Sequence, residues 1–145
     1  MKTIETRFSR MCVVRMETGE DVLEALSSAI EELRIRNAAI LSGVGSVRSY
    51  HVHVVETTSL PPGNIFFRGS GPFDILNVNG LVMDGRVHAH IVLSDQRGAT
   101  GGHLEPGCTV LTFCAVVLAE TDGGDLSDLD YRYQPREAAR RGEER

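Results

Sequence analysis

Two chain reversals within residues 80–107 constrain the fold of this 145-residue chain more than any other feature. The pair Asp84-Gly85 separates two apolar runs, and Asp-Gly is favoured in two-residue type I′ turns because both central residues need positive φ. The next segment, SDQRGATGGH, predicts a second reversal with a tight loop at Gln96-Arg97. The sequence therefore predicts three consecutive antiparallel strands.

The first turn sets a register that places two histidines on one face of the predicted sheet. Counting outward from the turn pairs Leu81 with His88 and Asn79 with His90. Paired residues share a face, and so do alternate residues along a strand, so Asn77 is predicted on that face too. The opposite face is apolar and predicts part of the core: Val78, Val82, Val87, Ala89, Ile91 and Leu93.

The second reversal is predicted to bring a third histidine to the same face. It would pair His90 with His103 and His88 with Glu105. Residues two apart on a strand are separated by ~6.6 Å and directly paired Cβ atoms by ~5 Å, so three imidazoles can close onto one ion. Three neutral imidazoles with an open position are one way in which catalytic zinc is held. The sequence predicts a site for zinc, or another divalent transition metal, at His88, His90 and His103.

Polar residues near these histidines are candidates for chemistry. A bound ion lowers the pKa of a water toward ~7 or polarises a carbonyl group. Glu105 is the candidate catalytic proton shuttle, or alternatively a fourth ligand that would make the metal structural. Asn77 and Asn79 could bind substrate, and Arg86 could attract a carboxylate. These last three residues are equally well explained as ordinary polar residues of the protein surface.

Two motifs upstream are assigned structural roles. Residues 43–46, Gly-Val-Gly-Ser, predict a turn after a short strand at 37–41. A second His-x-His pair, His51 and His53, alternates with Tyr50, Val52 and Val54, as is typical of a half-exposed strand. A contribution of His51 or His53 to the metal site is the alternative.

The rest of the chain predicts one main helix and further strands. An apolar stripe at Val22, Leu26 and Ile30 predicts a helix at about 20–34. Residues 7–16 and the β-branched run 108–119 predict strands, the latter in the middle of the sheet. The fold class is therefore α/β of the α+β type, mostly antiparallel sheet packed on one helix. We expect a single domain at 1–134 and a flexible charged tail at 135–145.

Composition and charge limit the kinds of partner and the cellular compartment that we expect. The net charge of -5 provides no field that favours a polyanion. The N-terminus lacks an apolar signal region, and no run approaches the ~18 apolar residues of a membrane span, so we expect a cytoplasmic protein. Cys12, Cys108 and Cys114 have no metal-like spacing and predict reduced thiols in the core.

Several segments together resemble the plant-and-prokaryote conserved (PPC) domain family, in the family's order from about residue 7 to 120. They are GEDVLEAL at 19–26, AAILSGVGSV at 38–47, GPFDIL at 71–76, DGRVHAHIVLSD at 84–95 and GGHLEPG at 101–107. The resemblance implies an antiparallel sheet packed on a helix and assembly as a homotrimer. The run HAH followed by GGH is also similar to the zinc-binding segment of acetolactate decarboxylase, which implies His88, His90 and His103 as zinc ligands. Nothing else matches the decarboxylase, so its substrate does not transfer.

Three functions from different classes follow. The first is a metal-dependent enzyme acting on a small oxygenated or carboxylate substrate, and the second is a trimeric binding or protein-assembly module with a structural metal or none. The third is DNA binding, since plant relatives join this domain to AT-hooks. Against the third, the chain lacks an Arg-Gly-Arg-Pro core, and its only adjacent basic pair is Arg140-Arg141. The sequence favours a metal-binding homotrimer and does not decide whether its site is catalytic.

Overall fold

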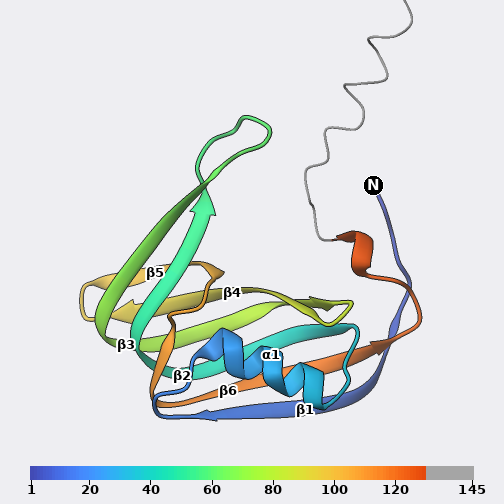
Figure 1. The fold of residues 1–145 in the computed structure, drawn as a ribbon, viewed down its shortest axis with the longest axis horizontal. Helices are drawn as coiled ribbons and strands as arrows, with labels where there is room; N and C mark the ends of the chain where they lie inside the picture. Colours follow the sequence, from blue (N-terminus) through green and yellow to red (C-terminus); the bar gives the residue numbers. More distant parts are fainter. Residues whose placement is uncertain (130–145) are drawn as a thin grey trace, which may run out of the picture.

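The computed structural model describes residues 1–129, and these form six strands, one α-helix and a short 3₁₀ helix (Figure 1). In chain order the elements are β1 Arg7–Glu17, α1 Val22–Glu32, β2 Ala38–Val55, β3 Asn64–Met83, β4 Arg86–Asp95, β5 Gly98–Leu104, β6 Thr109–Asp122 and η1 Ser127–Leu129. The antiparallel sheet and single main helix confirm the predicted fold class. Neither described helix is long and apolar enough to cross a membrane. The tail predicted from residue 135 lies outside the described residues.

The six strands form one sheet that partly closes on itself. Their order is β1-β6-β2-β3-β4-β5, and β5 also pairs with β2 through Val52↔Leu104 and His53↔His103. Strands β2 and β3 continue beyond the rest of the sheet as a projecting hairpin (Figure 1). The closure matters because it places the end of β2 beside residues that lie about fifty positions later in the chain.

The predicted hairpin between β3 and β4 is confirmed in turn type and register. Asp84 and Gly85 have φ of 50° and 77°, as a type I′ turn requires. Leu81 pairs with His88 and Asn79 with His90. Gly85 N–H donates to the carbonyl of Arg36 over 2.7 Å, which fastens the turn to the start of β2. The second predicted loop is confirmed as well, since Asp95 pairs with Gly98 across residues 96 and 97.

Helix α1 covers the apolar face of the sheet. Asp21 caps the helix, because its Oδ1 accepts from the backbone N–H groups of Leu23 and Glu24, each over 3.0 Å. Its buried residues join the core with Val78, Val82, Ala89, Ile91 and Leu93, as predicted for these five, while Val87 is half-buried against the same cluster. The side chains at His88 and His90 therefore lie on the face opposite α1.

The predicted turn at residues 43–46 is wrong, because β2 runs through it without a break. Register shifts between Ile40 and Ser42, and between Gly45 and Val47, interrupt its pairing with β6 without ending the strand. A Cβ at Gly43 would lie 2.6 Å from the Cβ of Val78. The glycine is therefore explained by close packing of a continuous strand.

The cysteines are free thiols, as predicted. Cys108 and Cys114 are buried, and Cys12 is half-buried and packs against the core. Burial raises the pKa of both Cys108 and Cys114 to about 11, so each is protonated at neutral pH. These residues contribute to packing and lack the thiolate that a nucleophile needs.

Candidate metal centre

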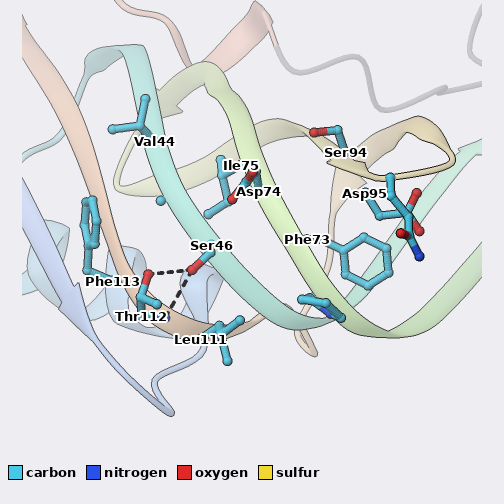
Figure 2. A pocket seen from close by; sticks show the side chains of 13 residues that line it. Val44, Ser46, Phe73, Asp74, Ile75, Ser94, Asp95, Leu111, Thr112 and Phe113 are labelled. Atoms are coloured by element: carbon cyan, nitrogen blue, oxygen red, sulfur yellow. Dashed lines mark hydrogen bonds between the residues drawn. The ribbon is translucent and has the colours of Figure 1, made fainter.

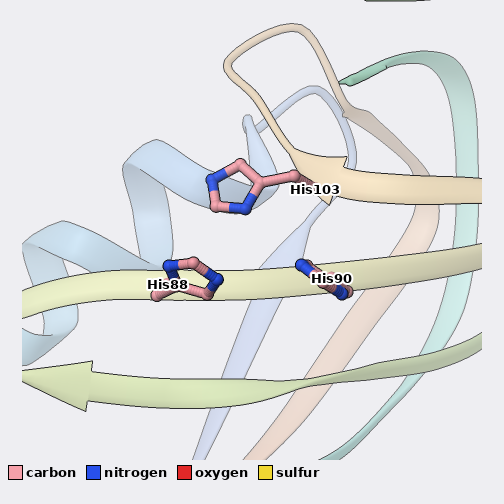
Figure 3. Close-up of side chains that lie close together, drawn as sticks. All are labelled: His88, His90 and His103. Atoms are coloured by element: carbon pink, nitrogen blue, oxygen red, sulfur yellow. The ribbon is translucent and has the colours of Figure 1, made fainter. Parts of the chain in front are cut away.

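Three histidines from two adjacent strands converge on the sheet face opposite α1 (Figure 3). His88 and His90 lie on β4 and His103 lies on β5. The ring centroids are 5.6 Å apart for His88 and His90, 4.7 Å for His88 and His103, and 5.5 Å for His90 and His103. One ring nitrogen of each lies within 4.8 Å of the others. The structure therefore brings the three predicted ligands together.

Two glycines explain how β5 comes close enough for this convergence. The cross-strand pair His90↔His103 requires β5 to lie against β4, and the pair His53↔His103 requires it to lie against β2. A Cβ at Gly101 would lie 3.1 Å from the Cα of Val92, and one at Gly102 would lie 2.6 Å from the backbone oxygen of His53. The two glycines before His103 are thus needed for β5 to pack closely against β4 at Gly101 and against β2 at Gly102.

The environment favours the neutral form of two of these imidazoles, those of His90 and His103. Burial, reinforced by the neighbouring His53, His88 and His90, lowers the pKa of His103 to about 4. Burial is also the main cause that lowers the pKa of His90, and His88 and His53 add to it. A neutral imidazole has a lone pair free for coordination, whereas an imidazolium does not. Three imidazole donors fit a transition metal such as zinc.

His53 lies beside this site, although the sequence pattern predicts for it an ordinary position on a half-exposed strand. It pairs directly with His103, and the two ring centroids are 4.5 Å apart. Its Nδ1 lies 2.7 Å from Oε1 of Glu105, and the two side chains are only 17% and 24% exposed. The alternation of residues along β2 could not reveal this neighbour, because the signal is the long-range pairing of β2 with β5.

The predicted pairing of His88 with Glu105 is wrong. The ladder between β4 and β5 ends at His90↔His103, and β5 itself ends at Leu104. Glu105 instead follows β2, since its backbone N–H donates to the carbonyl of His51 over 3.1 Å. The Glu105 carboxylate consequently reaches the cluster through His53 rather than from opposite His88.

His51 has a structural place. It is 8% exposed, and its Nδ1 lies 2.8 Å from the carbonyl oxygen of Pro106. Its backbone N–H also donates to Sγ of Cys108. The prediction of a half-exposed strand is therefore wrong at His51, whose ring instead joins β2 to the Pro106-Gly107 turn.

The three predicted substrate-binding residues lie at different distances from the cluster along the strands. Asn79 is exposed and paired with His90, which makes it the nearest of the three in register. Asn77 is half-buried, and its Oδ1 accepts from the backbone N–H of Gly43 over 3.4 Å. Arg86 is exposed beside the turn and paired with Met83. Only Asn79 therefore adjoins a predicted ligand directly across the strands.

A separate cavity of about 780 Å³ lies away from the histidines (Figure 2). Its wall combines apolar side chains such as Phe73 and Phe113 with the hydroxyl groups of Ser46 and Thr112, whose oxygens are 2.5 Å apart. Among residues 1–129, no histidine or cysteine lines it. Ser46 therefore has no imidazole or thiolate beside it to activate its hydroxyl group.

A half-closed antiparallel sheet, one covering helix and a histidine cluster on the opposite face together define an α+β domain of the plant-and-prokaryote conserved type. The sequence profile of the Plants and Prokaryotes Conserved (PCC) domain matches residues 4–122. The chain belongs to this family.

Solved structures share the fold. A metal-containing protein of Archaeoglobus fulgidus is 24% identical, with a TM-score of 0.76 over 86% of this chain and 89% of that chain. A PPC protein of Pyrococcus horikoshii is 22% identical, with a TM-score of 0.73 over 86% and 87%. Acetolactate decarboxylase of Bacillus subtilis is 13% identical, with a TM-score of 0.60 over 92% of this chain and 65% of that chain. At these identities the likeness establishes the fold alone.

Curated relatives are much longer proteins. The chain is 28% identical over 125 residues to the bifunctional protein GlmU of Synechococcus sp. (strain JA-3-3Ab). It is 30% identical over 109 residues to the GlmU of Synechococcus sp. (strain JA-2-3B'a(2-13)). The matched regions cover most of this chain but only 18% and 16% of those proteins' lengths.

Proposed function

We propose that this PPC-domain protein binds a divalent transition metal, with zinc as the expected ion, through His88, His90 and His103. The observation that carries the proposal is the convergence of three ring nitrogens on one face of the sheet. The lowered pKa of His90 and of His103 supports it, because protons then compete weakly for those rings. The solved relative described as metal-containing, which shares the fold, is consistent with it.

The arrangement suits a small oxygenated or carboxylate substrate. A zinc ion held by three imidazoles supplies a Lewis acid and a bound water of lowered pKa. Among the chain's own residues, Asn79 lies next to His90 and can orient a polar group of the substrate. Glu105 accepts and returns a proton together with His53, to which it is hydrogen-bonded over 2.7 Å. Arg86, at the turn end of β4, provides positive charge for a carboxylate.

The test is the metal content of the purified protein, measured by elemental analysis after removal of any affinity tag. Wild type is expected to hold about one ion per chain, and His90→Ala to retain clearly less through purification because the site has lost one of its imidazoles. Asn79→Ala is the matched control, since this residue pairs with His90 across the strands but carries no imidazole. Near-zero metal in wild type and His90→Ala alike would remove the proposal.

Replacement of the ion by Co²⁺ would then separate an open site from a closed one. An open position predicts that acetate or azide changes the visible spectrum of the cobalt protein, because a small anion can join the coordination shell. A spectrum that no anion alters would assign the metal a structural role and remove the enzymatic part of the proposal.

A further inference from the structure

We propose that His53 and Glu105 form, together with His103, a second ligand set for the same ion, so that the cluster offers two alternative coordination positions. The inference rests on the proposed metal binding and deepens it. The second coordination position contains a carboxylate and lies beside the position formed by three imidazoles, and His103 belongs to both.

The geometry of the second set matches that of the first. One donor atom from each of His53, His103 and Glu105 lies within 4.8 Å of the others, the same limit that the three-histidine set meets. The His53 ring centroid is 4.5 Å from that of His103, closer than His88 or His90 comes. All three side chains are half-buried, so each is partly withdrawn from water and held by its surroundings.

Packing holds the second set in place. The β2–β5 pairing fixes the backbones of His53 and His103 opposite each other. Phe66, from the neighbouring strand β3, lies against the His53 ring with a centroid distance of 5.3 Å. The hydrogen bond from the Glu105 backbone to His51 keeps the carboxylate beside β2. Because these side chains are already held in place, they lose less conformational entropy when they bind an ion.

Two imidazoles and one carboxylate form an established set for zinc and for other first-row metals. The carboxylate adds a negative charge and a harder oxygen donor, which three neutral imidazoles lack. The second position should therefore tolerate harder ions such as Mn²⁺ better than the first does. In the absence of an ion the Glu105 oxygen is occupied by its hydrogen bond to Nδ1 of His53.

The two positions exclude each other. A neutral imidazole has one lone pair, so His103 can coordinate one ion at a time. Figure 3 shows a nitrogen of His103 facing His88 and His90, which is the arrangement for the first position. The five residues form two groups of three that share His103, and no single larger group. One ion per chain is therefore the expected stoichiometry, whichever set holds it.

Cobalt titration of the metal-free full-length protein tests the inference, with metal content measured after gel filtration and the visible spectrum recorded throughout. The double variant His88→Ala/His90→Ala leaves the second set intact and is expected to bind one ion, about tenfold or more weakly, with a different spectrum. Adding Glu105→Gln to it should abolish that binding. His53→Ala/Glu105→Gln should still bind one ion, and His103→Ala should impair both sets. Circular dichroism verifies the folding of each variant, with His88→Gln/His90→Gln as a conservative substitute for the first.

The outcomes separate this inference from the proposed function. Binding by wild type and by His53→Ala/Glu105→Gln, but none by the folded His88/His90 variants, would overturn the second position and leave the proposed function standing. Two ions per wild-type chain would overturn the mutual exclusion. Binding that depends on His53 and Glu105 but not on His88 and His90 would support the second set and remove the first. Failure of wild type to bind would remove both.

Discussion

His103 is the residue on which the cluster depends, because it adjoins every other member. It pairs with His90 on one side and with His53 on the other, and its ring is 4.7 Å from that of His88. Burial, reinforced by these neighbouring histidines, lowers its pKa to about 4. In the metal-free protein, the pKa of His103 therefore differs between the folded and the unfolded state, and such a difference makes the free energy of unfolding depend on pH.

The sign of that linkage gives a prediction for the metal-free protein. In the unfolded chain His103 takes up a proton below about pH 6.5, whereas in the folded protein it does so only near pH 4. The unfolded state therefore binds more protons in this window, and stability falls as the pH is lowered through it. After allowance for solvent screening, the loss should be of the order of 1 kcal/mol.

Urea unfolding in the presence of a chelator, at several values between about pH 7.5 and pH 4, measures this loss. His103→Gln is the comparison, because it keeps a polar planar group that does not titrate. Wild type should lose more stability than the variant across the window. Parallel curves for the two proteins would contradict the prediction.

At the scale of the elements, the sequence predicted what local turn chemistry dictates. Asp84-Gly85 sets the turn and hence the register of β3 with β4, and the reversal at Gln96-Arg97 sets β5 against β4 as far as His90↔His103. Both pairings join neighbouring segments, so residue alternation is enough to assign faces. The three histidines of the candidate site follow from these two hairpins alone.

What the sequence did not predict depends on non-local packing. The continuity of β2 through Gly43 and Gly45 depends on what lies against those glycines, and a glycine pair by itself resembles a turn. The contact of His53 with Glu105 depends on closure of β5 onto β2, a pairing without a connecting turn. No local pattern encodes such a pairing, so the alternation of residues around His53 predicts only a half-exposed strand.

The closure of β5 onto β2 is open to a direct test at Gly102. Alanine there would place a Cβ 2.6 Å from the backbone oxygen of His53, closer than unbonded atoms approach. We expect Gly102→Ala to force the two strands apart and to lower the free energy of unfolding by about 1–3 kcal/mol. Urea unfolding measures the change. Thr100→Ala, at an exposed position of the same strand, should alter stability by no more than about 0.5 kcal/mol, and an equal effect of both would contradict the assigned role of Gly102.

At the scale of the whole molecule, charge and apolar surface point to different partners. The net charge of -5 opposes attraction to a polyanion. The outer surface of the sheet, by contrast, exposes large apolar side chains on several strands: Met11, Val13, Val44, Leu76 and Val92. Exposed apolar area of this kind is more typical of a protein interface than of a surface that stays in water.

For nucleic acid we expect no specific or salt-sensitive binding. Duplex DNA binds through phosphate contacts made by clustered lysine and arginine, and its affinity then falls steeply with salt. A gel-shift titration at low and at moderate salt, with a basic DNA-binding protein as the positive control, measures this. A retarded band that weakens as salt is raised would contradict the expectation and restore the DNA-binding alternative.

Self-association is the partnership that we propose, as a homotrimer built through the exposed apolar face of the sheet. Val13 is 68% exposed on the edge strand β1, and Val44 is 49% exposed on β2.

Light scattering coupled to gel filtration should give wild type three times the 15.8 kDa chain mass. Val13→Asp/Val44→Asp should shift the mass toward one chain, because a charge in an apolar interface loses its hydration without gaining a partner. Glu24→Lys, on the exposed side of α1, should leave the mass unchanged. A wild-type protein that runs as a single chain at high micromolar concentration would remove the trimer.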